Sequence, residues 1–449
     1  MVNTRRTEEV LSISETRTKE QMYVQNNNNL MEQVIERSNI KKAFKRVRSN
    51  KGAPGIDGMQ TEKLCAHLEK NWLQLKEELL EGTYKPSSVR GVEIPKPDGG
   101  VRQLGIPTVL DRFIQQAIQQ VLTRIFDPQF SKESYGFRPK HSARQAVELA
   151  QRHIQRGRHW VVDIDLEKFF DKVNHDILMY KLSREVKDKR ILRIIRRYLE
   201  AGVMLNGVCA RMEAGTPQGG PLSPLLANIM LNDLDKELSK RGHLFVRYAD
   251  DCNIYVSSNR AGQRVFASVS KFIKDRLMLK VNAKKSAVDV PWKRKFLGFS
   301  FYRTECSIKI CVALKSLERF KERIRQLTKR NVSMNIKTRV RKLNEYLIGW
   351  SGYFALAENR GKFQGLDGWI RRRLRMCLLK QWKRGKTKLR NLKQLGIEEK
   401  WAGRIAYSRK MCWRLANTPQ INKALDNAYW QNQGLIRLVD CYYKVRMTI

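Results

Sequence analysis

The sequence predicts an α+β fold in which a mixed N-terminal part is followed by an all-helical C-terminal part. Up to about residue 304, short apolar runs typical of strands are interspersed with segments whose apolar residues recur every three or four positions, as in helices. Beyond about 310 the strand patterns end and acidic residues become scarce. The 449 residues are enough for two to four compact units with cores of their own.

The net charge indicates a polyanionic partner. The chain has 88 Lys and Arg residues against 44 Asp and Glu residues, a formal charge of +44. So much positive charge repels itself in a compact protein unless an anion neutralises it, and nucleic acid is the simplest such anion. Affinity that is carried by phosphate contacts should fall steeply with salt.

The sequence does not indicate a membrane or a secretory route. No apolar run approaches the ~20 residues that span a bilayer, and the N-terminus lacks an apolar signal core. The eight cysteines include no C-x-x-C pair, which disfavours a zinc ribbon and favours free thiols in a reducing compartment. We therefore expect a cytoplasmic protein, associated with the nucleoid when it is bound to DNA.

The N-terminal part begins with a polar stretch, residues 1–30, that we expect to be a flexible tail. The elements expected after it are two short helices between 31 and 47, a glycine-rich loop at 51–58, a helix over 61–81 ended by Gly82, a hairpin of 92–96 and 101–106 around a glycine turn, and a helix over 108–126.

The middle of the chain continues the mixed pattern. We expect a loop at 134–139, a helix over 142–157, a strand over 160–166, helices within 174–203, a glycine-rich loop at 215–221, a helix over 222–240, a hairpin over 245–256, a helix over 260–277, and short strands at 279–281 and 296–301.

The C-terminal part is predicted to be helical and basic, with a boundary near 305–312. Trp350, Tyr353 and Phe354 share one helical face, which we interpret as core. Residues 371–390 contain ten basic residues and no acidic one, a density that would be hard to justify without a polyanion.

Three acidic residues indicate a metal site. Asp250 and Asp251 are adjacent in the turn of the second expected hairpin. Adjacent carboxylates repel each other, so a fold that presents them together usually neutralises them with a cation, and Mg²⁺ suits such ligands beside substrate phosphates. Asp165 ends a strand whose alternation puts it on one face with Asp163. Joined in one sheet, the three acids could hold two Mg²⁺ ions for phosphoryl transfer. The alternative is a solvated turn, since Asp is common in turns.

Five motifs give the chain a resemblance to a known family. In order they are SYGFRP at 134–139, DLEKFFD at 165–171, GTPQGGPLSPLLANI at 215–229, RYADD at 247–251 and FLGF at 296–299. With these motifs the chain resembles bacterial group II intron reverse transcriptases, also called maturases, and among them the compact class C type. Many members end in a zinc-supported HNH endonuclease domain, whereas no cysteine-pair cluster follows residue 391 here, so DNA cleavage is not expected.

The resemblance implies a right-hand polymerase. Residues 31–304 would form the fingers and palm, an antiparallel sheet plus helices with an N-terminal extension. Residues 305–390 would form the all-α thumb, or maturase domain X, and 391–449 a small basic helical DNA-binding domain.

The resemblance also implies roles for individual residues. Asp165, Asp250 and Asp251 would be the catalytic triad that binds two Mg²⁺ ions, and a backbone carbonyl of Ile164 or Leu166 would complete the metal coordination.

The incoming nucleotide would be bound from two sides. Lys96 and Arg102 on the first hairpin would clamp the triphosphate, although each could instead be a solvated cation. Gln218 and Gly219 would line the nucleotide and the template, where glycine permits close backbone approach. Phe170 would be the steric gate that excludes a ribose 2′-hydroxyl; the alternative is a plain core phenylalanine.

Nucleic acid would be contacted at basic and loop positions along the chain. The predicted contacts are Lys51, Gly52, Arg138, Lys285, Arg371, Arg372, Arg375, Lys383 and Arg384. Lys51 and Gly52 belong to a loop that resembles the family block covering the template strand, and Lys285 would support the primer or the palm.

The leading hypothesis is an RNA-directed DNA polymerase that copies intron RNA and binds it to assist splicing and mobility. Its partners would be group II intron RNA, an RNA template with a DNA primer, target DNA and deoxynucleoside triphosphates; whether it forms a homodimer is left open. Three alternatives are an RNA-binding splicing cofactor without polymerase activity, an RNA-dependent RNA polymerase and a retroelement-derived defence enzyme. The three aspartates argue against the first, Phe170 against the second, and the N-terminal block against the third.

Overall fold

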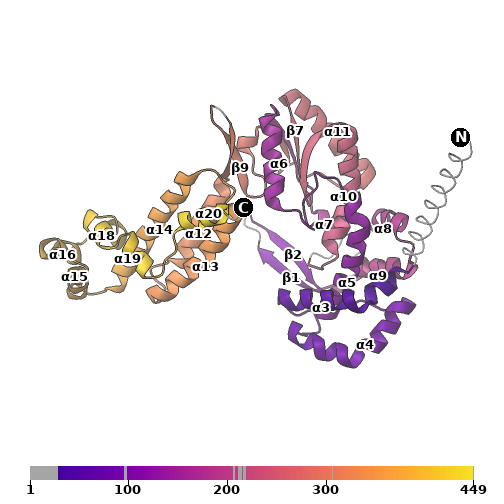
Figure 1. Ribbon diagram of the computed structural model, residues 1–449, viewed down its shortest axis with the longest axis horizontal. Helices are drawn as coiled ribbons and strands as arrows, with labels where there is room; N and C mark the ends of the chain where they lie inside the picture. The colour runs from indigo at the N-terminus through magenta and orange to yellow at the C-terminus, as the bar shows by residue number, and fades with distance from the viewer. Residues whose placement is uncertain are drawn as a thin grey trace, which may run out of the picture. The chain divides into compact units, whose positions relative to one another are not determined.

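The computed structural model describes residues 29–95, 99–205, 208–210, 215, 219–305 and 307–447. They fall into two compact units, one that ends at Asp289 and one that begins at Val290 (Figure 1). Residues 1–28 of the predicted tail lie outside the described residues. The prediction was wrong for Leu30, which is 2 % exposed and begins the first helix.

Helices form the N-terminal part of the first unit. They are α2 (Leu30–Ile35), α3 (Arg37–Asn50), α4 (Leu64–Glu81, after a 3₁₀ turn at Thr61–Lys63) and α5 (Val109–Phe126, before a 3₁₀ turn at Asp127–Gln129). All were predicted. Gly82 ends α4 in the left-handed conformation (φ +69°), which glycine adopts without strain. Apolar residues of α5 are buried at the centre of this helical core.

A four-stranded sheet in the order β2-β1-β4-β5 stands beside these helices. The predicted hairpin is confirmed as β1 (Val89–Pro95) and β2 (Val101–Ile106), paired antiparallel. β4 (Val203–Leu205) pairs parallel with β1 and antiparallel with β5 (Val208–Ala210). Strands of three residues are too short for periodicity to reveal, which explains why β4 and β5 were not predicted.

A second four-stranded sheet, all antiparallel, has the order β6-β7-β3-β8. Its strands are β3 (Trp160–Ile164), β6 (Leu244–Tyr248), β7 (Asp251–Val256) and β8 (Ala287–Asp289). The second predicted hairpin is thereby confirmed. The predicted strand at 279–281 is only a single bridge between Leu166 and Val281.

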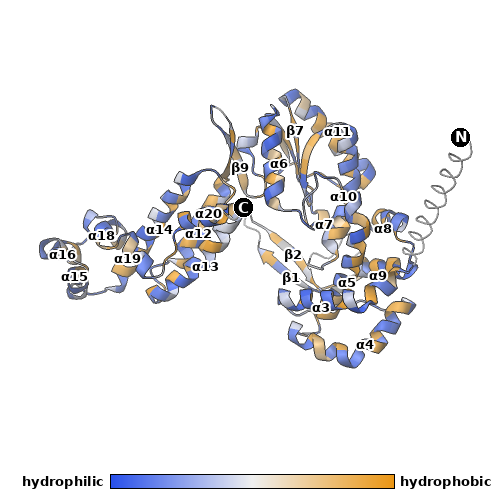
Figure 2. Cartoon of the chain, in the orientation of Figure 1, coloured by the Kyte–Doolittle hydropathy of each residue, from blue (hydrophilic) through white to orange (hydrophobic). Residues whose placement is uncertain are grey.

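Helices cover both faces of this second sheet (Figure 1). Alternate residues of β3 and β7, such as Val162 and Ile254, face the core shared with α10 (Ser223–Lys240) and α11 (Asn259–Leu277). The other face is covered by α6 (Ala143–Gln155), where the His153 ring lies 5.5 Å from that of Tyr255. Figure 2 shows hydrophilic and hydrophobic stretches along α11, as expected for a helix with one buried face. Three shorter helices, α7 (Phe169–Lys172), α8 (His175–Glu185) and α9 (Lys189–Glu200), follow β3.

The second unit begins with a short 3₁₀ turn (Pro291–Lys293) and a hairpin of β9 (Phe299–Arg303) and β10 (Ile308–Val312). The predicted strand at 296–301 was wrong in its first half. Leu297 (φ +51°) and Gly298 (φ +85°) form a tight turn that bridges Phe296 to Phe299. The predicted boundary at 304/305 falls between the two strands of this hairpin, and both strands belong to the second unit. The four-part division of the chain stays a prediction.

Helices make up the rest of the second unit. They are α12 (Leu314–Leu327), α13 (Ile336–Phe354), α14 (Arg360–Gln381), α15 (Gly385–Gln394), α16 (Glu399–Ala406), α17 (Cys412–Leu415), α18 (Pro419–Ala424), α19 (Asn427–Asn432) and α20 (Leu438–Met447). The predicted aromatic face is core for Trp350 and Phe354, each 8 % exposed, and Trp350 packs 4.4 Å from the Phe320 ring.

The last helix packs back on α13 and α14. Asp367 of α14 accepts hydrogen bonds from the N–H groups of Leu438 (2.8 Å) and Val439 (3.1 Å) at the start of α20. The Tyr442 hydroxyl donates to the Ala357 carbonyl at 2.9 Å. Segments 305–390 and 391–449 therefore share one core. None of the helices in the described residues is long and apolar enough to cross a bilayer.

Candidate active site

Two neighbouring strands bring Asp165 and Asp251 to the same end of the second sheet. The last residue pair between β3 and β7 is Ile164 with Cys252, so Asp165 and Asp251 are each the next residue outward. Side chains at facing positions of an antiparallel pair lie about 4.5–5.5 Å apart at Cβ. Asp250 occupies the two-residue turn between β6 and β7, beside Ala249 in the left-handed conformation (φ +57°). The sheet thus joins the three predicted acids at one edge.

The segment 282–286 brackets Asp165. The carboxylate oxygen Oδ2 of Asp165 lies 3.2 Å from Asn282 Nδ2 and 3.7 Å from Lys285 Nζ. The Asp165 N–H donates to Ser286 Oγ at 2.9 Å, and its carbonyl accepts from the Asn282 N–H at 2.8 Å. Lys285 is therefore positioned beside a predicted catalytic acid, and its contact with the primer stays a prediction.

A buried arginine supports the turn, and nothing in the sequence indicates this role beyond its place in the RYADD motif. Arg247 is fully buried and bonds Asp235 through Nε (2.7 Å) and Nη2 (2.6 Å). Its Nη1 donates to the Ala249 carbonyl in the turn at 2.8 Å and to Asn228 Oδ1 at 3.0 Å. Burial raises the pKa of Asp235, because it disfavours the charged carboxylate. Burial alone would lower the pKa of Arg247, but the adjacent Asp235 carboxylate outweighs it and raises that pKa. An ion pair without solvent thus fixes the turn backbone.

The SYGFRP loop lies against the same turn. A Cβ atom on Gly136 would lie 2.3 Å from the Ala249 nitrogen, so only glycine permits this approach. Asn228 Nδ2 donates to the Gly136 carbonyl at 2.8 Å, and the Tyr135 N–H donates to the Arg247 carbonyl at 2.9 Å. These contacts of the SYGFRP loop hold the aspartate turn in place.

Phe170 lies in α7, directly after the β3 strand that leads to Asp165. It is half-buried, and its ring packs 5.1 Å from that of Phe169. The glycine-rich loop begins against this turn, because the Gly215 N–H donates to the Val173 carbonyl at 2.9 Å. Phe170 is thus near both Asp165 in sequence and the predicted nucleotide loop in space, which fits a gate but also fits core packing.

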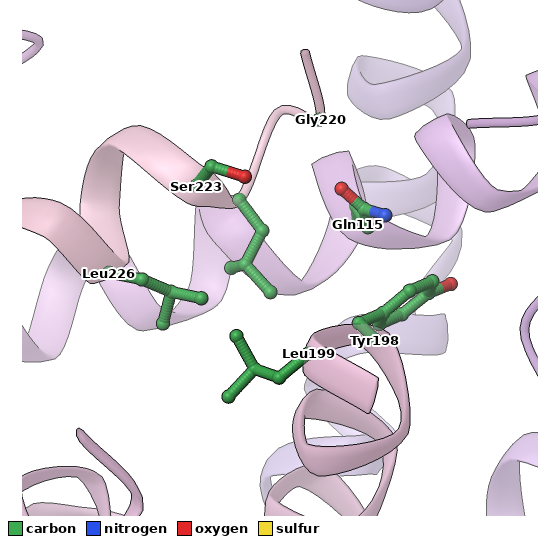
Figure 3. A pocket seen from close by; sticks show the side chains of 7 residues that line it. Gln115, Tyr198, Leu199, Gly220, Ser223 and Leu226 are labelled. Carbon is green, nitrogen blue, oxygen red and sulfur yellow. The ribbon is translucent and has the colours of Figure 1, made fainter. Parts of the chain in front are cut away.

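The far end of the glycine-rich loop lies against the first sheet and α5. Gly219 (φ +134°) approaches the Gly105 carbonyl so closely that a Cβ would lie 2.6 Å from its oxygen. Gly220, with Gln115 of α5 and Tyr198 of α9, surrounds a cavity of about 10 Å³ where the loop enters α10 (Figure 3). Gly219 and Gly220 thereby contact β2 and α5.

A groove of about 590 Å³ in the first unit collects several predicted contacts. Arg138, Gly219 and Gly220 line it, together with Arg46 and Arg112, which the sequence did not single out. Lys51 and Gly52 directly follow α3, whose last turn lines the groove. Its three arginines make the groove basic.

Arg138 has protein partners of its own. Its Nε bonds Asp127 Oδ1 at 2.7 Å, and Nη1 donates to the carbonyls of Ser131 (2.6 Å) and Ser134 (2.8 Å). Through these bonds, Arg138 stabilises the SYGFRP loop. A direct contact with nucleic acid stays a prediction.

The remaining predicted site residues of the first unit either lie outside the described residues or take part in the sheet. Lys96 and Gln218 lie outside the described residues, and for Arg102 only its place in β2 is defined. Ile164 lies in the β3–β7 ladder, and Leu166 bridges to Val281.

The predicted contacts of the second unit divide into exposed and buried residues. Lys383 and Arg384 are exposed between α14 and α15, whereas Arg371 and Arg372 are half-buried on α14. Arg375 is 7 % exposed and donates to the Leu425 carbonyl at 3.0 Å. This bond explains Arg375 as a link between α14 and the C-terminal segment.

The donor set suits divalent magnesium, because carboxylate oxygens are the ligands it prefers. The strand register brings carboxylates of Asp165 and Asp251 together, with Asp250 in the adjoining turn. In the part of the chain that the structure describes, however, no three acidic, His or Cys side chains converge into a closed metal cluster as they stand. The site therefore fits magnesium in the type of its ligands and in their placement at the ends of adjacent strands.

Comparison with known proteins gives a consistent assignment. Residues 94–301 match the family "Reverse transcriptase (RNA-dependent DNA polymerase)", and residues 317–396 match "Group II intron, maturase-specific domain". The reverse transcriptase match thus includes the aspartate turn and its sheet, and the maturase-specific match lies in the helical region that follows. More particularly, the order of the two domains places the chain among the group II intron-encoded reverse transcriptases and maturases.

Sequence similarity to individual proteins supports this assignment. The chain is 40 % identical over 200 residues to Protein YkfC of Escherichia coli (strain K12), covering 43 % of this chain and 52 % of that protein. It is 37 % identical over 195 residues to the group II intron-encoded protein LtrA of Lactococcus lactis subsp. cremoris, covering 43 % and 32 %. The putative COX1/OXI3 intron 2 protein of Saccharomyces cerevisiae is 27 % identical over 381 residues, covering 71 % and 44 %. The match thus spans about half or less of each relative's length.

Proposed function

We propose that the chain is an RNA-directed DNA polymerase that copies intron RNA into DNA and binds that RNA to assist splicing and mobility. The observation that carries the proposal is the register of β3, β6 and β7, which joins Asp165, Asp250 and Asp251 at one sheet edge. The matched reverse transcriptase and maturase domains support it.

In this proposal the three carboxylates hold the divalent ions that reverse transcriptases generally use. When bound, two such ions would supply activation of the primer 3′-hydroxyl and stabilisation of the departing pyrophosphate. The protein contributes positioning: Arg247 fixes the turn backbone, and Asn282 orients the Asp165 carboxylate. Lys285 offsets part of the negative charge at Asp165.

Nucleotide selection would involve the residues around α7 and the glycine-rich loop. Phe170 would exclude the ribose 2′-hydroxyl, while Gly219 would allow the backbone to approach the templating base pair. Lys96, Arg102 and Gln218 would contact the triphosphate and the base. The groove that contains Arg46 and Arg112 offers a path for the template strand, because these two arginines can pair with phosphates, whereas Arg138 is already paired with Asp127.

The intron RNA and the target DNA would be bound chiefly by the basic second unit. A splicing cofactor without polymerase activity is the alternative. The supported aspartate turn favours polymerase activity, because a pure RNA-binding protein has no need to hold three carboxylates together against their repulsion.

Primer extension tests the proposal. The full chain, with Mg²⁺, is given a DNA primer on an RNA template and either deoxynucleotides or ribonucleotides. We expect extension with deoxynucleotides only. Tight RNA binding without any extension would support the splicing cofactor, and extension with ribonucleotides would support an RNA polymerase.

A further inference from the structure

A second groove, of about 450 Å³, lies in the second unit between α14 and the segment that contains α17 and α18. It is lined by Trp369, Arg371, Arg372 and Arg375 of α14 and by Asn417 and Asn422 of the C-terminal segment. Its volume is in the range of small-ligand sites, about 300–1,000 Å³, and would hold one nucleotide unit. We refer to it as the α14 groove.

The cations of the α14 groove are held in place. The Arg372 guanidinium stacks 4.0 Å from the centre of the Trp413 ring and donates to the Trp413 carbonyl at 3.3 Å. The Arg375 guanidinium is fixed by the Leu425 carbonyl and by Asn422. Because these side chains are already ordered, a ligand would pay little conformational entropy to engage them.

The positive charge in the α14 groove is poorly compensated. Within the described residues, none of its three arginines forms an ion pair with an acid. The nearest acids, Asp367 and Asp426, accept hydrogen bonds at the starts of α20 and α19, and from there they offset part of the charge of Arg371 and Arg375. The Arg372 Nε is buried and has no hydrogen-bond partner in the described part of the chain. Burial lowers the pKa of Arg375 to about 10, so this group stays charged at neutral pH.

These features point to an anion of a particular kind. Cations without acid partners fit a phosphate, which guanidinium groups bind with paired hydrogen bonds. The half-exposed Trp369 lines the groove with an aromatic ring, whose centre lies 5.9 Å from the Arg325 and Arg373 guanidiniums. The two asparagine side chains can donate to and accept from a base edge. The run of basic residues at 371–390 extends beyond the groove, which favours a strand over a free nucleotide.

We infer that the α14 groove binds one nucleotide unit of a single-stranded nucleic acid, with Arg371 and Arg372 at its phosphate and Trp369, Asn417 and Asn422 around its base. The inference rests on the proposed nucleic-acid binding and specifies a site for it. Because its walls come from both 305–390 and 391–449, this binding would bridge the two segments.

Crosslinking locates the site in the full chain. The probes are 12-nucleotide single strands of RNA and of DNA that carry one photoactivatable thio-base, and the crosslinked peptides are identified by mass spectrometry. We expect crosslinks to peptides within 360–381 or 412–425. The strand type that crosslinks there identifies the ligand as RNA, DNA or both; crosslinks confined to other parts of the chain would overturn the inference.

Binding of the same probes measures the energetic role. Arg371→Ala and Arg372→Ala should each weaken binding about tenfold and lower the salt slope by about one. Lys362→Ala, an exposed cation on α14 outside the groove, should change affinity by less than about twofold. Equal losses in all three variants would show general charge attraction and contradict a site. If either arginine variant fails to fold, Asn417→Asp replaces it, since an acid in the groove should repel the phosphate.

Primer extension by the same preparations separates the two proposals. A parent chain that gives the expected crosslinks but no extension would remove the polymerase proposal and keep the α14 groove. Extension without those crosslinks would remove the groove alone.

Discussion

Arg247 and Asp235 form a two-point ion pair that is fully buried, with N–O distances of 2.7 and 2.6 Å, and Arg247 also holds the Ala249 carbonyl in the aspartate turn. Removal of one charge leaves the other buried without a partner, which costs far more than an exposed pair would. The pair therefore couples the stability of the palm to the position of Asp250 and Asp251.

Arg247→Met should lower the free energy of unfolding of the first unit by about 3–5 kcal/mol, because Asp235 would stay buried and unpaired. The double variant Arg247→Met/Asp235→Leu should recover most of this loss but should still extend primers poorly, because the bond to the Ala249 carbonyl is gone. Urea unfolding and extension assays check both. Arg241→Ala, in a partly exposed pair with Glu237, is the control and should cost less than about 1 kcal/mol. Full activity in the double variant would contradict the positioning role.

Gly136→Ala should displace the aspartate turn, because its new Cβ would meet the Ala249 nitrogen at 2.3 Å. We expect a loss of about 1–3 kcal/mol in stability, typical of overpacking, and a lower extension rate. Gly365→Ala in α14 is the matched control, since its Cβ would meet nothing within 4 Å. A Gly136→Ala protein with parental stability and rate would show that the loop can shift without effect on the turn.

Asp188 should make the protein sensitive to acid. Burial acts to raise its pKa, but hydrogen bonds from Arg190 (2.9 Å) and the Met31 N–H (3.0 Å) outweigh burial and hold the pKa below its ordinary value. A carboxyl with a lowered folded pKa adds stability above its unfolded pKa of about 3.9, and this stability is lost as the pH falls through the folded pKa.

Asp188→Asn should therefore cost about 1.5–3 kcal/mol at pH 7, the worth of a hydrogen bond to a charged group, and the difference from the parent should shrink as the carboxyl is protonated in acid. Urea unfolding from pH 7 to pH 2 measures this. Glu32→Gln, which removes the more exposed partner of Arg190, should cost under about 1 kcal/mol. A difference between Asp188→Asn and the parent that is constant with pH would refute the assignment.

Phe170→Val should admit ribonucleotides. If the ring blocks the 2′-hydroxyl, the preference for deoxynucleotides, measured as a ratio of kcat/KM, should fall at least about tenfold. Phe266→Val, at another half-buried ring position in α11, should keep the preference. An unchanged ratio in Phe170→Val would identify Phe170 as a core residue only.

Sequence patterns predicted the fold well where elements are long. The helices from α3 to α11, except the unpredicted four-residue α7, and the β6–β7 hairpin follow from periodicity, since their apolar faces are buried as the spacing requires. Three-residue strands such as β4 and β8 depend on distant partners and leave no periodic signal. The turn at Leu297 and Gly298 has the composition of a strand, and only its left-handed backbone, which tertiary packing imposes, distinguishes it.

The candidate site was predictable in its acids but not in their support. Asp250 and Asp251 are conspicuous as adjacent carboxylates, and Asp165 follows an apolar strand. The partners Asp235 and Asn228 lie in α10 among ordinary helix residues, and only the fold brings them to Arg247. Arg138 looked like a nucleic-acid contact because its charge is visible in the sequence, whereas its bonds to Asp127 and to two carbonyls are not.

The most direct measurement is primer extension on an RNA template with Mg²⁺ and deoxynucleotides, comparing the parent with Asp250→Ala and with Asp275→Ala, an exposed acid on α11. RNA affinity is measured in parallel. We predict extension by the parent and by Asp275→Ala, none by Asp250→Ala, and similar RNA affinity in all three. Extension by Asp250→Ala at the parental rate, or an equal loss of extension and RNA binding in that variant, would contradict a catalytic role for the aspartate turn.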